Sequence, residues 1–163
     1  MKSILSVLVE NKSGILSRTA GLFARRGFNI ESLAVGETAD TRVSRMTIVV
    51  EGDQNIIGQV EKQLNKQIDV IKVRALDKDD AVCREAALIK VKAGADVRGQ
   101  ITDIAAIMKA DIVDFSPTTV TLEVIDTPER VRQLLDLLVP YGISEMARTG
   151  TVALLKGSNS LNV

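Results

Sequence analysis

The sequence predicts an α+β protein made of two consecutive ferredoxin-like βαββαβ sandwiches. Two observations lead to this prediction. Short apolar runs typical of strands alternate with helical stripes in the order βαββαβ, and this order occurs twice in the 163 residues. A charged stretch without apolar periodicity, beginning at Asp77, lies between the two occurrences. We therefore expect a first domain over residues 1–76, a linker over 77–82 and a second domain over 83–163.

The first half opens with an apolar run, Ile4–Val9, that is typical of a buried strand. The helix that follows should end at Gly27, because Arg25 and Arg26 suit a last helical turn and glycine suits the position after it. Asp53 is placed to cap a second helix. Three further strands are expected from apolar content or alternation, at residues 29–35, 45–50 and 70–73.

The second half repeats this order. Its last helix should begin after Thr127, a suitable N-cap, with Pro128 at the first helical position, and should stop at Pro140–Gly142. In a βαββαβ fold the two helices cover one face of an antiparallel sheet with strand order 4-1-3-2. The strands of this half are expected at residues 87–91, 112–115 and 120–124, followed by extended structure over 143–155.

Composition excludes several classes of function. Histidine is absent, which removes the usual general base near neutral pH and all imidazole metal ligands. Cys83 is the single cysteine, so one chain cannot form a disulfide framework or a paired-cysteine site. The sequence also lacks a phosphate-binding fingerprint and a recognisable acid–base pair. These absences predict no metal site and no recognisable catalytic residue, and they disfavour independent catalysis, which only carboxylates brought together by the fold could still supply.

Charge and hydropathy limit the partners and the location. Lysine plus arginine number 21 and aspartate plus glutamate 21, so no net field attracts nucleic acid or anionic membranes. Aromatic residues make up 2% of the chain, too few for base-stacking platforms. No apolar run approaches the ~20 residues that a transmembrane helix needs, and the start lacks a signal-peptide pattern. We expect a cytoplasmic protein.

Each half is small enough to need a partner. A domain of ~75 to 80 residues buries little more than ~60% of its unfolded surface, so association with another domain or chain is expected. In strand order 4-1-3-2 the second strand, residues 29–35, lies at an edge and leaves backbone groups unpaired. Its mostly apolar sequence favours a homodimer formed through this edge.

The most informative loop is Asn11–Gly14, at the start of the first helix. Backbone N–H groups at a helix N-terminus, an amide side chain and a glycine that permits close approach suit a small carboxylate. The alternative is a plain strand-to-helix turn in which Ser13 caps the helix. Asn29 has a similar alternative, since it can simply satisfy its own backbone. If the second strands pair across a symmetry axis, however, Asn29 and Ile30 of one chain approach the loop of the other.

Several stretches closely resemble the small regulatory subunits of acetolactate synthase, also called acetohydroxyacid synthase. The resemblance covers about residues 1–157 and is most specific in the first half. It is carried by ENKSGILSR (10–18), GLFARRGFNIESL (21–33), SRMTI (44–48), EKQLNK (61–66), REAALIKV (84–91) and GISEMARTG (142–150).

This resemblance implies that the first domain is an ACT domain, a module that binds amino acids at dimer interfaces. It implies a regulatory role in branched-chain amino acid biosynthesis, in which the chain activates a separate catalytic large subunit and confers feedback inhibition by valine or a related amino acid. Thiamine diphosphate, magnesium and FAD would then belong to the large subunit. Carried over by position, the effector would contact Asn11, Gly14, Ile15 and Leu16 of one chain and Asn29 and Ile30 of the other.

A second function stays open at this point. A free-standing amino-acid sensor or transcriptional regulator could use the same modules without an enzyme partner. The absence of an evident helix-turn-helix and the zero net charge argue against DNA binding.

Overall fold

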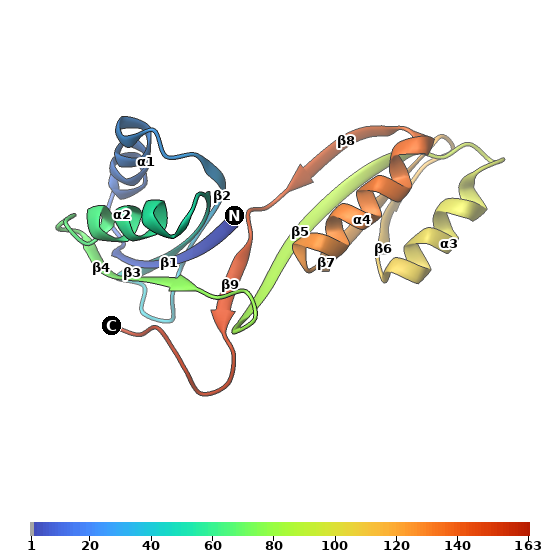
Figure 1. Cartoon of the computed structure of the whole chain (residues 1–163). Coiled ribbons are helices and arrows are strands. Elements are labelled where there is room, and N and C mark those ends of the chain that lie inside the picture. The colour runs from blue at the N-terminus through green and yellow to red at the C-terminus, as the bar shows by residue number, and fades with distance from the viewer. Residues whose placement is uncertain (1) are drawn as a thin grey trace. The chain divides into compact units, whose positions relative to one another are not determined.

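The computed structural model describes residues 2–163, which form two compact units (Figure 1). The first unit contains the chain up to Cys83 together with Gly150–Val163, and the second contains Arg84–Thr149. The predicted second domain ran from residue 83 to residue 163, so the structure differs in assigning the last 14 residues, Gly150–Val163, to the first unit. Since a unit is defined by what its residues pack against, the position of a segment along the chain does not decide its membership.

The first unit has the predicted βαββαβ order. It runs through β1 (Lys2–Glu10), α1 (Ile15–Arg26), β2 (Ile30–Glu37), β3 (Val43–Glu51), α2 (Gln54–Leu64) and β4 (Val70–Leu76). The strands form one sheet in the order β2-β3-β1-β4, and all neighbours are antiparallel. This confirms both the predicted strand order and the edge position of β2.

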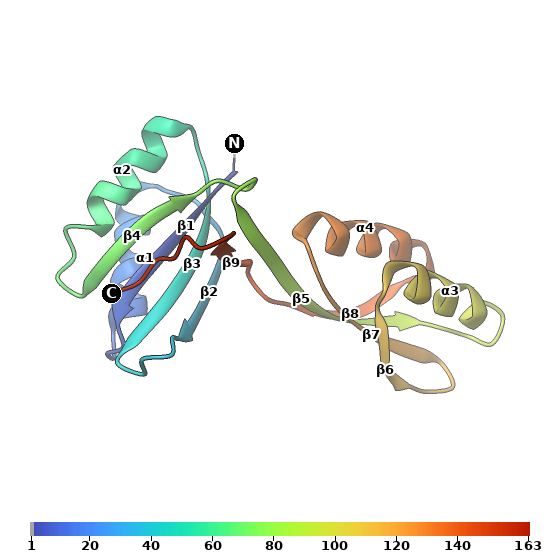
Figure 2. The same cartoon turned by 90° about the horizontal axis from the view of Figure 1, so that it is seen from below.

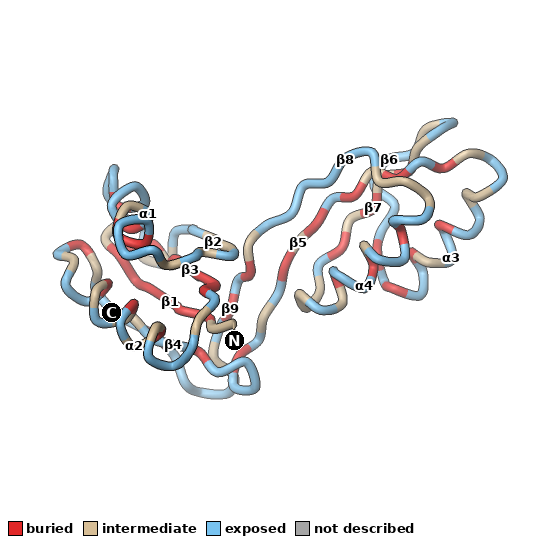
Figure 3. Tube along the Cα trace, turned by 45° about the horizontal axis from the view of Figure 1, so that its top comes forward, coloured by how far each residue is buried: buried red, intermediate tan, exposed pale blue. Residues whose placement is uncertain are grey.

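One face of this sheet packs against α1 and α2. Alternate residues of the central strands are fully buried beneath the helices, as expected for a period of two. Figure 3 shows β1 as buried along most of its length. The helices contribute Leu22, Phe23, Val60 and Leu64, and the sheet contributes Leu5, Val7, Met46, Ile48 and Val50.

The C-terminal segment, residues 150–163, covers the other face. It contains a short strand, β9 (Val152–Leu155), that pairs with the start of β5 (Ala81–Lys92). Ala153 packs with Ile4 and Val49, and Leu161 packs with Leu8 and Val43. Figure 2 shows this segment on the side of the sheet away from α1. Residues of opposite parity along β1 and β3 are thus buried by different parts of the chain.

The second unit repeats the order in a second antiparallel sheet. After the start of β5 come α3 (Arg98–Met108), β6 (Asp111–Phe115), β7 (Thr119–Asp126), α4 (Pro128–Leu138) and β8 (Ile143–Arg148). The strand order is β6-β7-β5-β8, again as predicted. Its core is apolar and includes Ile89, Ile101, Leu122 and Leu134.

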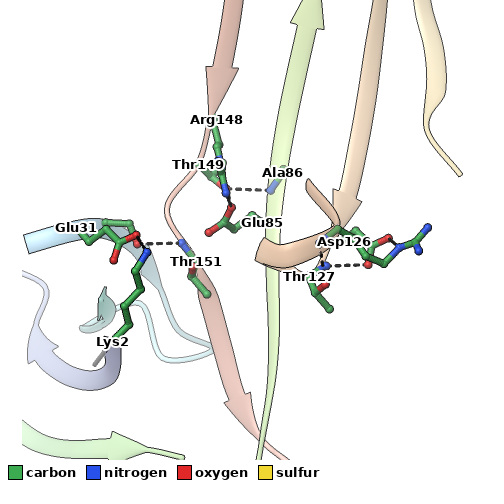
Figure 4. Close-up of polar contacts among 11 residues, drawn as sticks. Lys2, Glu31, Glu85, Ala86, Asp126, Thr127, Arg148, Thr149 and Thr151 are labelled. Atoms are coloured by element: carbon green, nitrogen blue, oxygen red, sulfur yellow. Dashed lines mark hydrogen bonds and ion pairs between the residues drawn. The ribbon is translucent and has the colours of Figure 1, made fainter. Parts of the chain in front are cut away.

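Helix ends follow the signals in the sequence. The side chain of Asp53 accepts a hydrogen bond from the Ile56 N–H at 2.9 Å, and Thr127 accepts one from the Arg130 N–H at 3.3 Å. Figure 4 shows Thr127 beside Asp126. The Asp126 carboxylate accepts a hydrogen bond from the backbone N–H of Thr127 at 2.7 Å. Gly27 takes φ 67° after α1, the left-handed conformation that favours glycine at a helix end.

The predicted linker over residues 77–82 is shorter in the structure. Ala81 and Val82 already belong to β5, and Ala81 is buried with Ala153 beneath the first sheet. The backbone carbonyl of Asp80 accepts from the Lys156 N–H at 2.8 Å. None of the helices formed by residues 2–163 has the length and apolar character of a transmembrane span.

Candidate functional site

The loop between β1 and α1 presents backbone donors at the start of a helix. Gly14 is the N-cap residue, with φ 84° in the left-handed region, and no side chain caps this end. The alternative in which Ser13 caps α1 is therefore wrong. A Cβ built on Gly14 would meet no atom within 4 Å, so the space above the glycine is open.

Asn11 is held by the hairpin that joins β2 to β3. Its side-chain amide nitrogen donates to Glu37 Oε1 at 3.0 Å and to the Thr41 carbonyl at 2.9 Å. Its backbone N–H donates to the Arg42 carbonyl at 2.8 Å. These bonds use nitrogen atoms only, so the amide oxygen of Asn11 takes no part in them.

The hairpin that holds Asn11 has its own ion pair. Arg42 donates to the Asp40 carboxylate through Nε at 3.0 Å and through Nη2 at 2.7 Å, and its backbone N–H adds a third bond at 3.0 Å. These bonds stabilise the ionised form and lower the pKa of Asp40 to about 2. The turn that supplies the Thr41 and Arg42 carbonyls is thereby fixed.

Charges near the start of α1 are largely paired. Lys12 forms an ion pair with Glu10, and this contact raises the pKa of Lys12. Arg18 Nη2 lies 2.8 Å from the buried carboxylate of Asp69. The first turn of α1 carries no acidic residue. Its free N–H groups and the positive end of the helix dipole can therefore accept a small carboxylate.

The predicted site residues of this loop differ in what they can offer. Ile15 is buried in the core, so only its backbone is available there. Leu16 is 44% exposed and presents an apolar side chain to solvent. Asn11 and Gly14 are both exposed. One chain therefore brings together Asn11, Gly14, Ile15 and Leu16 at the same end of α1.

Asn29 and Ile30 lie at the opposite end of that helix. They follow Gly27, and the 12 residues of α1 separate them from Gly14 by about 18 Å along the axis. Asn29 is exposed, whereas Ile30 is half-buried against the core. A single chain does not unite them with the Asn11 loop, so a common site needs a second chain.

Glu37 and Thr41 bond to Asn11 but were not singled out from the sequence. Both come from a stretch recognised only as a polar loop after a strand. Which of its groups meets Asn11 depends on the pairing of β2 with β3, which places Glu37 opposite Ser44. Within residues 2–163, no group of three or more carboxylate, thiol or imidazole side chains is arranged to hold a metal ion.

Comparison with known proteins gives one family along the whole chain. A model of the AHAS small subunit-like ACT domain matches residues 5–72, and one of the small subunit of acetolactate synthase matches residues 84–157. The acetolactate synthase small subunit of Mycolicibacterium smegmatis is 49% identical over 96% of this chain and 92% of its own. The chain belongs to the acetolactate synthase small-subunit family.

Other members of the small-subunit family agree in sequence and in structure. The probable acetolactate synthase small subunit of Archaeoglobus fulgidus is 51% identical over 97% of this chain and 99% of its own. The crystal structure of the small subunit from Thermotoga maritima aligns with a TM-score of 0.91 at 38% identity, covering 98% of this chain and 99% of that one. The resemblance noted in the sequence is confirmed, and the first unit is an ACT domain.

Proposed function

We propose that this chain is the regulatory subunit of a branched-chain acetolactate synthase, with an amino-acid effector bound between the ACT domains of a homodimer. In this proposal it activates a catalytic large subunit and makes that subunit sensitive to valine or a related amino acid. Family membership supports the regulatory role, because the relatives are named small subunits of acetolactate synthase. Thiamine diphosphate, magnesium and FAD would be held by the large subunit, and the complex would work in the cytoplasm.

The observation that carries the proposal is the hydrogen bond between Asn11 and Glu37. It places the Asn11 loop at the C-terminal end of β2, an edge strand whose outer side has no neighbour in the sheet. Antiparallel pairing of two β2 edges about a twofold axis puts the start of one strand beside the end of the other. The partner's Asn29 and Ile30 would then face Asn11 across the interface.

Such a shared pocket offers a partner for each part of an aliphatic amino acid. The N–H groups that follow Gly14 suit the carboxylate, and the exposed carboxylate of Glu37 suits the ammonium group. The side chain of Leu16 and Ile30 of the partner subunit supply apolar contact for a branched side chain. Because two chains build the pocket, the effector also stabilises their association.

Regulation would follow from a shift between two arrangements of the dimer. An effector inhibits only if it binds more tightly to the arrangement that holds the large subunit in its less active state. By the same linkage, binding of the large subunit changes the affinity for the effector by an equal factor. No catalytic residue is required of this chain.

The test is a comparison of binding and activity. At about 100 times its dissociation constant an effector adds ~2.7 kcal/mol, which corresponds to ~5 to 10 °C in the melting temperature of a chain of this length. We expect valine, leucine or isoleucine alone among the standard amino acids to give this rise. We also expect the chain to co-purify with the large subunit, to raise its activity and to make it sensitive to the same amino acid. A chain that binds no amino acid and leaves the activity of the large subunit unchanged would refute the proposal.

A further inference from the structure

Where the chain returns to the first unit it approaches β2 closely enough to require glycine. A Cβ on Gly150 would lie 2.7 Å from the carbonyl oxygen of Leu33, 2.8 Å from its carbonyl carbon and 3.0 Å from its nitrogen. All three atoms are backbone, which cannot swing aside as a flexible side chain can. A methyl group here fits only if β2 or the returning segment shifts.

The next residue adds a directional bond to the same strand. Thr151 is 4% exposed, and its backbone N–H donates to Ser32 Oγ at 3.4 Å. Figure 4 shows Thr151 facing the strand that carries Glu31. Two successive residues of the returning segment therefore contact two successive residues of β2, Ser32 and Leu33.

The start of β2 depends on such support. As an edge strand it pairs only with β3, and the register shifts between Ile30 and Ser32. A bulge of this kind interrupts the ladder and re-aims the neighbouring side chains. On the helix side, Ile30 and Leu33 pack against the core of the first unit, and the ion pair between Lys2 and Glu31 and the contacts with Gly150 and Thr151 add further support from outside the hairpin.

The chain immediately before Gly150 is held within the second unit. The Thr149 N–H donates to the Ala86 carbonyl at 2.9 Å, and Thr149 Oγ1 accepts from the Ala86 N–H at 3.0 Å. Arg148 forms an ion pair with the buried carboxylate of Glu85 (Figure 4). A single peptide bond therefore joins a residue fixed to β5, Thr149, to a residue packed on β2, Gly150.

We propose that Gly150 and Thr151 are positioning residues that set the start of β2 and connect the effector site to the second unit. This inference rests on the function proposed above, because it concerns the same Asn29 and Ile30. In this proposal, a displacement of the end of β8 reaches Gly150 through Thr149 and then reaches Leu33 by contact. Ile30 lies three residues before Leu33 on the same strand, so we expect it to respond to that displacement.

The test is Gly150→Ala in the assembled enzyme, with Gly58→Ala as the matched control. Gly58 lies inside α2 of the same unit, and a Cβ there meets no atom within 4 Å. We expect Gly150→Ala to activate the large subunit as the wild type does. We expect it to raise the concentration of valine, leucine or isoleucine that gives half-inhibition by about tenfold, within the usual range of coupling between sites. The control should leave both quantities unchanged.

Two further measurements keep the outcome clear. Ser32→Ala removes the side-chain oxygen that accepts from the Thr151 N–H, and it introduces no clash. It should raise the half-inhibiting concentration too, but by less than Gly150→Ala does. This variant keeps the proposal testable if Gly150→Ala does not fold. Hydrogen exchange of the amides of residues 30–35 should be faster in Gly150→Ala than in Gly58→Ala, with no effector present. A wild type that responds to no amino acid would refute the proposed function. A responsive wild type with unchanged half-inhibition in both variants and unchanged exchange would refute the positioning role alone.

Discussion

Asn11 and Gly14 occupy the same loop, but they are fixed in different ways. Gly14 takes its conformation from the chain itself, because φ 84° is accessible to glycine and costly for most other residues. Asn11 takes its position from Glu37 and Thr41, more than 20 residues further along the chain. A change at Gly14 therefore acts directly on the ligand space, whereas a change in the hairpin acts through Asn11.

Gly14→Asp should abolish the response to the effector. The carboxylate would occupy the open space above the helix N-terminus and repel the carboxylate of the ligand. Gly14→Asn is the matched control, since asparagine has nearly the same shape and tolerates the left-handed region about equally well. We expect no thermal shift with valine, leucine or isoleucine for the aspartate variant and a reduced but measurable shift for the asparagine variant. Equal responses in the two variants would contradict a carboxylate site at this position.

The ion pair of Asp40 with Arg42 should make stability depend on pH at the acid end. The folded-state pKa of Asp40 is lowered from 3.8 to about 2, so its contribution is fully present above pH 3.8 and is lost as the pH falls through about 2. The difference in melting temperature between the wild type and Asp40→Asn should be constant from pH 7 to about 4 and narrow from there to 2. Arg42→Gln removes the same pair and should lose the same pH dependence. If the difference in melting temperature stays the same down to pH 2, the ion pair does not contribute to the stability of the fold.

Among the elements, the C-terminal segment has little regular structure but buries apolar residues of the first sheet. Residues 150–163 contain only the four residues of β9 in regular structure. They nevertheless bury the face of the first sheet that the helices leave open, through Ala153 and Leu161. Arg45 Nη2 donates to the Leu161 carbonyl at 3.1 Å and Lys72 Nζ to the Asn162 carbonyl at 3.0 Å, so the sheet also binds the backbone of the segment.

Leu161→Ala should destabilise the first unit by about 2 kcal/mol, at the lower end of the range for buried leucine because its cluster is small. Leu161 is 5% exposed and contacts Leu8 and Val43. Val163→Ala is the control, since Val163 is 79% exposed and its truncation should leave stability unchanged. Urea unfolding measures the loss of stability. Hydrogen exchange of the backbone amides then shows whether that loss lies in β1 and β3. Equal stability of the two variants would mean that the segment does not protect the sheet.

The regular elements could be predicted because their residues repeat with the period of a helix or a strand. The Leu22 and Val60 stripes and the alternation of Met46, Ile48 and Val50 all face one core, and each local pattern agrees with the fold. Leu161 lies in a polar stretch without periodicity, so its burial could not be inferred. Residues 143–155 formed one extended run in the sequence, and only packing divides it into β8 and β9.

The candidate site could be predicted only in part, for a related reason. Gly14 and the start of α1 are local features, and the sequence located them correctly. The alternative in which Ser13 caps the helix is wrong because the left-handed backbone conformation at Gly14 makes the glycine the N-cap residue. The bond from Asn11 to Glu37 depends on strand register, which no local pattern specifies.

At the scale of the whole molecule, each of the two sheets ends in edge strands, and a partner is proposed only for β2. The edge strand β2 carries the proposed dimer interface, and β6 is an edge strand of the second sheet. Each has an exposed valine, Val35 at 46% and Val113 at 50%. Edge strands pair with other chains unless charge or irregular structure prevents it. Replacing each of these two valines with lysine therefore tests which edge strand takes part in dimer formation.

Val35→Lys should convert the homodimer into monomers, whereas Val113→Lys should leave the dimer intact. Within the proposed interface each lysine must give up part of its hydration without a partner charge, while a lysine on an unpaired edge remains in water. Because the proposed pocket needs Asn29 and Ile30 of a second chain, Val35→Lys should also lose the thermal shift with valine, leucine or isoleucine. Sedimentation equilibrium with and without the amino acid measures both effects on the same samples. A Val35→Lys chain that stays dimeric and still binds the effector would place both the interface and the pocket elsewhere on the chain.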